Sequence, residues 1–238
     1  MQNQIHHIMT IQEAITARHS VRQYTDKPIE PEKIEQIAAL IENCNSEGGV
    51  HIQLVTNEPS AFSGGIAKYG NFSGIKNYIA MVCKKNDDTK LGYYGEQIVL
   101  LAQTLGLNTC WVGLNFSKQP DKYKVGKDEK LICLVSLGYG TNQGVPHPQK
   151  KGYEAYCDDL RSNKQALPDW FVNGMKSALL APTAVNQQKF KFLLHDGNKV
   201  EATTTFSLFN GFGYSKLDLG IAKYHFEIGA GKENFQWI

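Results

Sequence analysis

The stretch from Arg18 to Tyr24 reads Arg-His-Ser-Val-Arg-Gln-Tyr and gathers cationic and hydroxyl groups in one short segment. Guanidinium groups bind phosphate oxygens bidentately, and a serine hydroxyl adds a neutral donor. Arg18, Ser20 and Arg22 therefore favour a site for a phosphate ester, with the His19 ring as a further nitrogen donor. Basic residues near the last turn of a helix also suit the helix dipole and cap free carbonyls, so a purely structural role is the alternative.

A short amphipathic helix precedes this stretch. Thr10 and Glu13 have the spacing of a capping box at a helix start. The apolar residues that follow recur at helical spacing, and Arg18 falls on the same pattern. The helix is therefore expected to deliver Arg18 to the site.

The remaining chain alternates between helices and short strands. Helices are indicated from Pro31, over 91–107, after Pro168 and over 216–230. Strands are indicated at 50–56, 78–83, 109–113, 131–137, 189–195 and 199–206, and a last one ends in Trp237. Asp196-Gly197 is a hairpin signal. Residues 59–74 are expected to form a long loop, and 146–152 an extended surface crossing.

The order helix, loop, strand, helix, strand occurs twice along the chain, which indicates an internal repeat. Leu91 and Leu217 are 126 residues apart, and so are Trp111 and Trp237. The central helix and the tryptophan strand thus recur at one spacing. Short apolar elements of one type also align by chance, and coincidence is the alternative.

Several motifs resemble those of the FMN-dependent nitroreductase family. Arg-His-Ser-Val-Arg-x-Tyr at 18–24, followed by Pro-Ile-x-Pro at 28–31, is similar to the family's N-terminal signature. Further similar motifs lie at 92–96, 105–113 and 218–222. The resemblance implies that Arg18, His19, Ser20 and Arg22 hold the phosphate of flavin mononucleotide (FMN).

The two halves of the chain divide the family's signatures between them. Ala-Pro-Thr-Ala-Val-Asn-Gln-Gln at 181–188 resembles the family's Pro-Ser-x-x-Asn-x-Gln-Pro turn, although Lys189 stands where the last proline is usual. The N-terminal half has Asn45 to Gly49 at that point instead. The chain therefore resembles a single-chain subfamily in which a duplicated fold imitates the family dimer.

This resemblance implies an α+β fold with two pseudo-symmetric α/β halves, whose central helices are flanked by mixed or antiparallel sheets. The halves are expected at 1–160, with the phosphate site, and at 161–238, with the flavin turn, forming one compact unit. The chain is then expected to be a monomer, because the family's subunit contact is made within it. Dimerisation of whole chains stays open.

The resemblance also assigns roles at the flavin ring. Pro182, Thr183, Ala184 and Asn186 would meet its pyrimidine edge, since the Asn amide both donates and accepts; an ordinary Asn-tolerant turn is the alternative. Trp111, Val112 and Gly113 would supply backbone groups near N5, while the Trp111 ring itself is expected in the core. Lys150 and Lys151 are lesser candidates for the phosphate, and a solvated surface run is the alternative.

The implied function is an FMN-dependent oxidoreductase. Hydride would pass from NAD(P)H through FMN to a small-molecule acceptor, such as a nitroaromatic, a quinone or a similar electrophile, in a ping-pong cycle. No side-chain base is required, so no catalytic residue is assigned. The competing functions are a flavin-binding protein for storage or sensing, without turnover, and an interaction domain that binds no flavin.

Composition limits the remaining function classes. The 238 residues carry a net charge of only +2, which gives no electrostatic case for a nucleic-acid partner. No stretch approaches the roughly 18 apolar residues of a membrane helix, and the N-terminus lacks a secretory pattern, so a cytoplasmic protein without a membrane partner is expected. Five scattered cysteines are expected to be buried thiols rather than disulfides or metal ligands.

Overall fold

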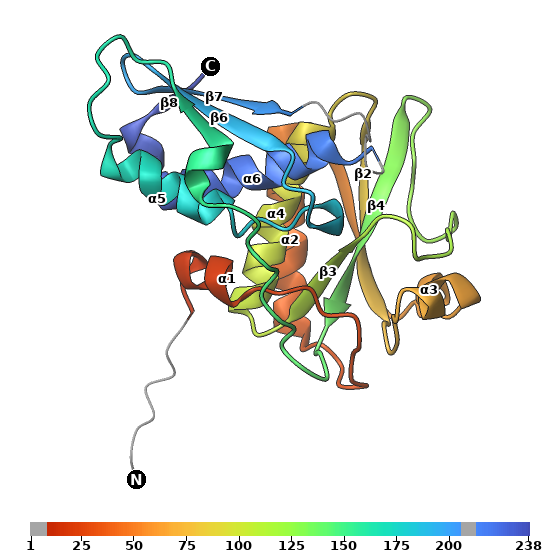
Figure 1. The fold of residues 1–238 in the computed structure, drawn as a ribbon. Coiled ribbons are helices and arrows are strands. Elements are labelled where there is room, and N and C mark those ends of the chain that lie inside the picture. Colours follow the sequence, from red (N-terminus) through yellow and green to blue (C-terminus); the bar gives the residue numbers. More distant parts are fainter. Residues whose placement is uncertain (1–8, 206–212) are drawn as a thin grey trace.

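Two four-stranded sheets lie on opposite sides of a pair of central helices (Figure 1). The computed structural model describes residues 9–205 and 213–238. The expected end of one strand at Phe206 and the first residues of the N-terminus lie outside the described residues. The arrangement is α+β with two sheets, which confirms the predicted fold class.

The first sheet is antiparallel and has the order β1-β2-β4-β3. Its strands are β1 (His51–Val55), β2 (Asn77–Lys84), β3 (Asn108–Val112) and β4 (Glu129–Gly138). The apolar residues 78–83 of β2 are fully buried because the strand is central and covered on both faces. β3 lies at an edge, which leaves one side of its backbone available for other partners.

The second sheet is mixed and has the order β5-β6-β7-β8. Its strands are β5 (Cys157–Asp159), β6 (Phe190–His195), β7 (Lys199–Thr204) and β8 (Gln236–Trp237). β6 and β7 form the hairpin predicted at Asp196-Gly197, where Gly197 has a φ of 71°. Such a backbone conformation favours glycine, which explains the turn signal in the sequence.

The central helices α4 (Asp88–Thr104) and α6 (Ser215–Ala230) cross at two glycines. A Cβ on Gly92 would lie 2.1 Å from the Leu217 carbonyl oxygen, and one on Gly220 would lie 1.9 Å from that of Thr89. The two contacts mirror each other, since 220 − 92 and 217 − 89 both equal 128. At their crossing the helices therefore correspond at a spacing of 128 rather than the 126 expected from Leu91 and Leu217.

In the part of the chain that the structure describes, four other helices complete the layers: α1 (Ile11–Ala17), α2 (Pro31–Gly48), α3 (Gly65–Tyr69) and α5 (Asp169–Ala178). The short 3-10 turns are η1 (Ser60–Phe62), η2 (Tyr153–Tyr156), η3 (Ala184–Asn186) and η4 (Lys232–Asn234). The capping box of Thr10 and Glu13 forms as predicted. Residues 59–74, expected as a loop, include η1 and α3, which are too short to show helical periodicity.

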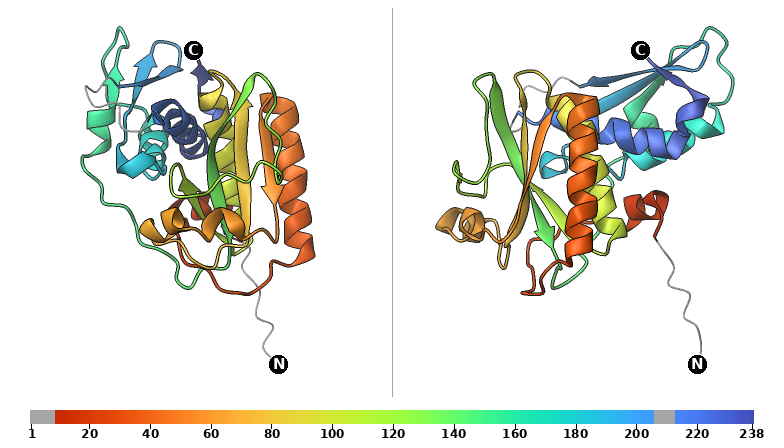
Figure 2. Two further views of the ribbon diagram at one scale, coloured as in Figure 1. Left: turned by 90° about the vertical axis from the view of Figure 1, so that its right-hand side faces the viewer. Right: turned by 180° about the vertical axis from the view of Figure 1, so that it is seen from behind.

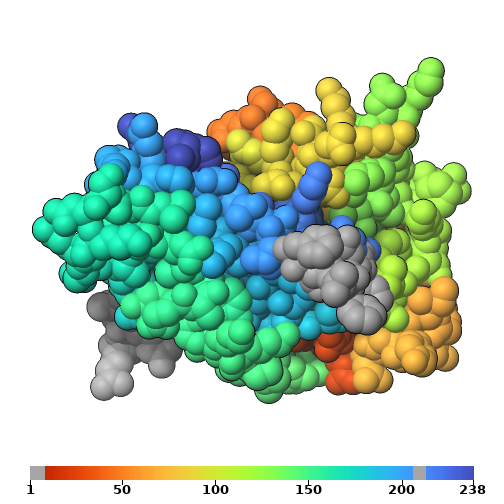
Figure 3. All heavy atoms as spheres, turned by 45° about the horizontal axis from the view of Figure 1, so that its top comes forward, coloured from red at the N-terminus to blue at the C-terminus, as the bar shows by residue number. Residues whose placement is uncertain are grey.

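The halves pack into one continuous body. Two further views show α2 and α4 on the face of the first sheet, and α5 and α6 under the second (Figure 2). The space-filling view shows the yellow and yellow-green segments meeting the cyan and blue ones (Figure 3). Buried rings of Phe171, Phe192 and Phe226 pack together between α5, α6 and the second sheet. Among the described residues, no helix is long and apolar enough to cross a membrane.

Candidate functional site

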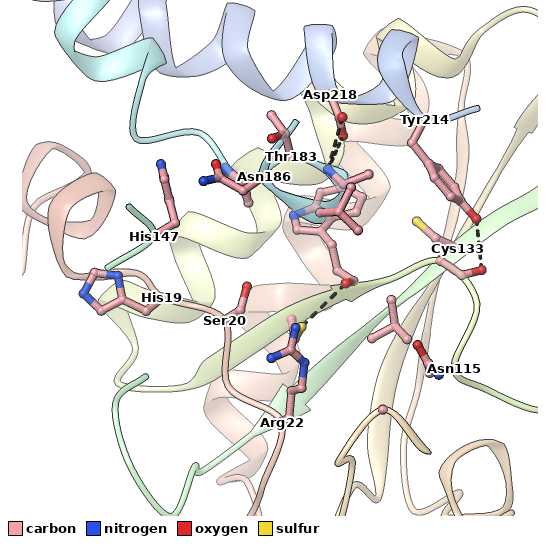
Figure 4. A pocket seen from close by; sticks show the side chains of 18 of the residues that line it. His19, Ser20, Arg22, Asn115, Cys133, His147, Thr183, Asn186, Tyr214 and Asp218 are labelled. Carbon is pink, nitrogen blue, oxygen red and sulfur yellow. Dashed lines mark hydrogen bonds between the residues drawn. The ribbon is translucent and has the colours of Figure 1, made fainter. Parts of the chain in front are cut away.

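A cavity of about 720 Å³ lies where the two halves of the chain meet (Figure 4). Its walls come from the 18–22 segment, the end of β3 with the residues that follow, the crossing at 145–148, the turn at 182–186 and the start of α6. The size falls in the range of small-molecule sites, roughly 300–1,000 Å³. Segments more than 150 residues apart in the sequence therefore build one site.

The free edge of β3 forms one wall. The 18–22 segment runs along this edge and pairs with it at Ser20 and Thr109, where Val21 N–H donates to the Thr109 carbonyl at 3.0 Å. Beyond that bridge, residues 110–113 line the cavity. An edge strand exposes backbone N–H and C=O groups, so this wall can bind a ligand through its main chain.

Arg18 brings a buried cation to the cavity. Its side chain is only 3% exposed, and its Nε lies 3.8 Å from the carboxylate of Glu96. Within the part of the chain that the structure describes, Nε and Nη1 have no hydrogen-bond partner. Burying polar groups without partners is costly, so these donors have capacity for an anionic ligand. Arg22, also on the wall, lies over the Phe72 ring at 5.8 Å.

A fully buried glutamate fixes the elements around Arg18. Glu96 on α4 accepts from Trp111 Nε1 and faces His225 Nε2, each at 2.9 Å. His225 Nδ1 faces the Ser177 carbonyl at 3.2 Å and must donate, because a carbonyl oxygen only accepts. This network ties α4, α6 and β3 together beneath the cavity.

The opposite wall is a strained turn at 183–188. Val185, Asn186 and Gln188 have φ values of 47°, 51° and 46°, in the left-handed region that non-glycine residues rarely adopt. Asn186 Nδ2 donates to the Pro148 carbonyl at 3.0 Å. Asn186 Oδ1 is buried without a hydrogen-bond partner among the described residues, and Asn186 lines the cavity. The turn thus retains an unused acceptor.

Asp218 holds this turn from the first turn of α6 (Figure 4). Its carboxylate accepts from the Ala184 N–H at 3.1 Å and from Gln187 Nε2 at 2.6 Å. Burial raises the pKa of Asp218 to about 6, against these hydrogen bonds and the charge of Lys189, which lower it. A carboxyl group that titrates near neutral pH therefore forms part of the wall.

Two histidines lie at one end of the cavity. Burial, and then the charges of Arg18 and His147, lower the pKa of His19, although a backbone hydrogen bond raises it. His147 Nε2 donates to the Leu179 carbonyl at 2.9 Å, which anchors the crossing segment to the end of α5. Two imidazole rings and the Arg18 guanidinium therefore lie close together at this end of the cavity.

The other end is apolar and aromatic. The Tyr214 hydroxyl donates to the Gly113 carbonyl at 2.9 Å, and burial raises the pKa of the nearby Cys133 thiol well above its usual value. Tyr69 and Leu114 line the rim with 90% and 59% of their side chains exposed. The cavity therefore combines a cationic region, a hydrogen-bonding turn and an open apolar mouth.

The lining contains all but two of the predicted site residues: Arg18, His19, Ser20, Arg22, Trp111, Val112, Gly113, Pro182, Thr183, Ala184 and Asn186. Their contacts with a flavin stay predictions. Lys150 and Lys151 are not in the lining; Lys150 Nζ instead donates to the Asn186 carbonyl at 2.5 Å and so supports the turn from outside.

His147, Tyr214 and Glu96 were not predicted to belong to the site, and Asp218 stood out in the sequence only as part of a motif. The Gly-Tyr-Tyr-Gly-Glu motif at 92–96 contained Glu96, and the motif at 218–222 began with Asp218. The signal that could have found them is a charged residue within an otherwise apolar helix pattern. His147 and Tyr214 carry no comparable signal.

Comparisons with known proteins agree with this architecture. A model of the family described as "Putative TM nitroreductase" matches residues 10–230. A protein from Thermotoga maritima, described as a putative nitroreductase, is 23% identical with a TM-score of 0.60, over 98% of this chain and 90% of that one. Nitroreductase A from Vibrio parahaemolyticus is 16% identical with a TM-score of 0.51, over 67% and 78%. No curated protein matches the sequence.

Proposed function

The chain belongs to the TM nitroreductase family, and on this premise we propose that its cavity binds FMN and that the protein is a nitroreductase-type oxidoreductase using NAD(P)H. The observation that carries the proposal is the meeting of Arg18, Ser20 and Arg22 with the turn at 182–186 in one cavity. The first group lies in the N-terminal half of the chain and the turn lies in the C-terminal half, so both halves contribute to the cavity.

The unused polar groups of the cavity fit this cofactor. The Arg18 donors that lack a hydrogen-bond partner among the described residues suit a phosphate group, which accepts several charge-assisted hydrogen bonds. The unused Asn186 Oδ1 suits a ring N–H, and the free edge of β3 offers main-chain groups to a flat ring. Cationic, amide and backbone groups are therefore present for the phosphate, the pyrimidine edge and the ring.

In this proposal Arg18, Ser20 and Arg22 hold the phosphate, with His19 beside them. Pro182, Thr183, Ala184 and Asn186 orient the pyrimidine edge, and the backbone of 111–113 lies against the ring. When bound, FMN would supply the redox chemistry, which is hydride transfer between a nicotinamide and an electrophile such as a nitroaromatic or a quinone. The cavity residues bind and orient, and none is needed as a catalytic base.

The proposal also covers the cycle and the assembly. Donor and acceptor would use the same open mouth, lined by Tyr69 and Leu114, in turn, which is a ping-pong cycle. The flavin site would need only one chain, because α4 and α6 bring both walls together within it. We therefore expect a monomer that functions without nucleic-acid or membrane partners.

The visible spectrum of the purified protein tests this proposal. We expect a yellow protein whose flavin bands bleach with NADH or NADPH under anaerobic conditions and return when a quinone or a nitroaromatic is added. A yellow protein that does not bleach would support storage or sensing instead. A colourless protein that binds no added FMN would refute the flavin site.

A further inference from the structure

The turn at 183–188 cannot hold its conformation through local preference. Val185 has φ 47° and ψ 31°, and its two neighbours in the left-handed region are Asn186 and Gln188. A β-branched residue in this region is a genuine outlier, and such residues persist only where the surroundings over-determine them. The turn must therefore be held by contacts from outside.

Asp218 provides such contacts through its carboxylate. Both of its oxygens lie 3.1 Å from the Ala184 N–H, and Oδ2 lies 2.6 Å from Gln187 Nε2. The two donors lie on either side of Val185. Asp218 is 3% exposed and sits on α6, which is fixed against α4 by the Gly220 contact. A rigid helix thus presents a carboxylate to the middle of the strained turn.

We propose that Asp218 is a positioning residue whose ionised carboxylate holds the 183–188 turn in the shape that receives the flavin ring, so that FMN affinity depends on its charge. This inference rests on the proposed function. The carboxylate is expected to act through the turn, by keeping Ala184 and Asn186 in place, and not through chemistry on the substrate.

The negative charge of Asp218 strengthens the hydrogen bonds that it accepts from the turn. An ionised carboxylate accepts hydrogen bonds that are roughly twice as strong as those of neutral groups. Burial raises the pKa of Asp218 to about 6, so the group is charged at pH 8 and loses its charge just below neutral pH. The titratable groups that act on it are Lys189, beyond the turn, and the Cys133 thiol on β4, which stays neutral because its pKa is raised.

The test compares FMN binding by the wild-type protein, Asp218→Asn and Asp88→Asn, followed by flavin fluorescence from about pH 5 to about pH 8. Asp88 is the matched control: it is a buried acid in the first turn of α4, pairs with Lys130 at 3.0 Å and does not line the cavity. The FMN phosphate and His19 are present in all three proteins and contribute equally to their pH dependence. The ratio of dissociation constants between variant and wild type therefore isolates Asp218.

We expect Asp218→Asn to bind FMN about tenfold more weakly at pH 8, since the new amide cannot accept both hydrogen bonds at the strength of a carboxylate. The ratio should fall toward one below about pH 6, where the wild-type carboxyl is also neutral. Asp88→Asn should keep a ratio near one throughout. A ratio for Asp218→Asn that is near one at pH 8, or constant across the range, overturns the proposal.

A rescue experiment separates strain from general damage. Glycine adopts left-handed backbone freely, so Val185→Gly should recover several-fold of the affinity lost in Asp218→Asn. No recovery counts against the strained-turn argument. If Asp218→Asn fails to fold, Gln187→Leu removes one donor to the carboxylate without touching α6, and unchanged affinity would then overturn the proposal.

Thermal melts of the flavin-free proteins give a second readout. Because the folded-state pKa of Asp218 is raised from 3.8 to about 6, its stabilising contribution is present at low pH and is lost as pH rises through about 6. The melting temperature of Asp218→Asn minus that of the wild type should therefore rise with pH, while FMN affinity shifts in the opposite sense. A wild-type protein that binds no FMN at pH 8 refutes the proposed function, whereas normal binding with a flat ratio refutes only the role of Asp218.

Discussion

Two tryptophans occupy similar settings on opposite sides of the central helices, but Trp111 lines the cavity described above and Trp237 does not. Trp111 on β3 donates its indole N–H to Glu96 on α4 at 2.9 Å, and Trp237 on β8 donates to Glu227 on α6 at 3.1 Å. Each glutamate is a buried acceptor on a central helix, and each tryptophan lies on the strand that follows that helix in the sequence. The same local unit therefore occurs in both halves.

The two tryptophan–glutamate pairs differ in how many of the polar groups around them have hydrogen-bond partners. Glu227 also accepts from the Tyr93 hydroxyl at 2.8 Å, and the Trp237 ring packs edge-on against Phe235 at 4.8 Å with Lys223 over it at 4.4 Å. Near Trp111, by contrast, Arg18 Nε and Nη1 have no hydrogen-bond partner among the described residues, although Nε lies 3.8 Å from Glu96. The surroundings of Trp237 are therefore a closed, packed core, whereas those of Trp111 contain donors that are available to a ligand.

The chain closes the second side with its own side chains. Asn45 stands in the N-terminal half where the family resemblance would place the flavin turn; it lies in α2, and its amide makes two hydrogen bonds to the backbone of Ile52 at 2.9 and 2.7 Å. The Tyr94 ring packs so closely on Gly48 that an added Cβ would lie 2.4 Å from it. Similar helix and strand elements thus border a cavity on one side of the molecule and a packed core on the other.

The largest effect is expected at the crossing of α4 and α6, which lies between the two tryptophan settings. Gly92→Ala and Gly220→Ala would each place a Cβ about 2 Å from a backbone oxygen of the other helix. We expect each to destabilise the protein by about 3 kcal/mol, or roughly 6–12 °C in melting temperature. Thermal melts would check this.

Gly65→Ala is the control, since a Cβ there meets nothing within 4 Å. A large loss for only one of the two crossing glycines would break the mirror relation between the helices.

The next effect separates the two sides by function. Arg18→Ala should weaken FMN binding by about 1.5–3 kcal/mol, or tenfold and more in dissociation constant, through loss of a charge-assisted phosphate contact. Arg18→Lys should bind FMN more weakly than the wild type but more tightly than Arg18→Ala, because lysine keeps the positive charge but lacks the planar guanidinium that binds phosphate bidentately. Lys223→Ala, on the closed side, is the control and should leave affinity unchanged. Full flavin retention by Arg18→Ala on dialysis would refute the phosphate assignment.

The smallest effect compares the tryptophans directly. Trp111→Phe and Trp237→Phe each leave a buried glutamate with one fewer donor, which should cost about 1–2 kcal/mol of stability in urea unfolding. Only Trp111→Phe should also lower FMN affinity, by a few-fold, because Trp111 lines the cavity. Weaker flavin binding in Trp237→Phe would show that the closed side takes part in the site.

Much of the fold could be predicted from the sequence, because it depends on interactions between residues that are close together in the chain. The capping box at Thr10, the hairpin at Asp196-Gly197 and the apolar run of β2 each depend on neighbouring residues, and all three form as expected. The two walls of the cavity at 18–24 and 181–188 were expected because these motifs resemble those of a known family. Pattern and spacing were sufficient where short-range physics decides the structure.

The remainder depends on contacts between distant segments. Lys150 supports the turn instead of lining the cavity, because the crossing segment runs behind Asn186. Asp218 reaches Ala184 only after α6 has packed on α4, and the left-handed backbone of Val185 contradicts its side-chain preference. No local pattern encodes such contacts, which is why the strained and electrostatically coupled part of the site appeared only in three dimensions.

The central claim is that one chain builds one complete flavin site. Sedimentation of the FMN-saturated protein, recorded at a protein wavelength and at a visible flavin wavelength over a wide dilution series, tests it most directly. We predict that flavin sediments with a species of monomer mass, 26.6 kDa, at one FMN per chain, and that this ratio does not change on dilution. Two flavins per chain, or flavin that sediments only with a dimer and is lost as the dimer dissociates, would contradict the claim.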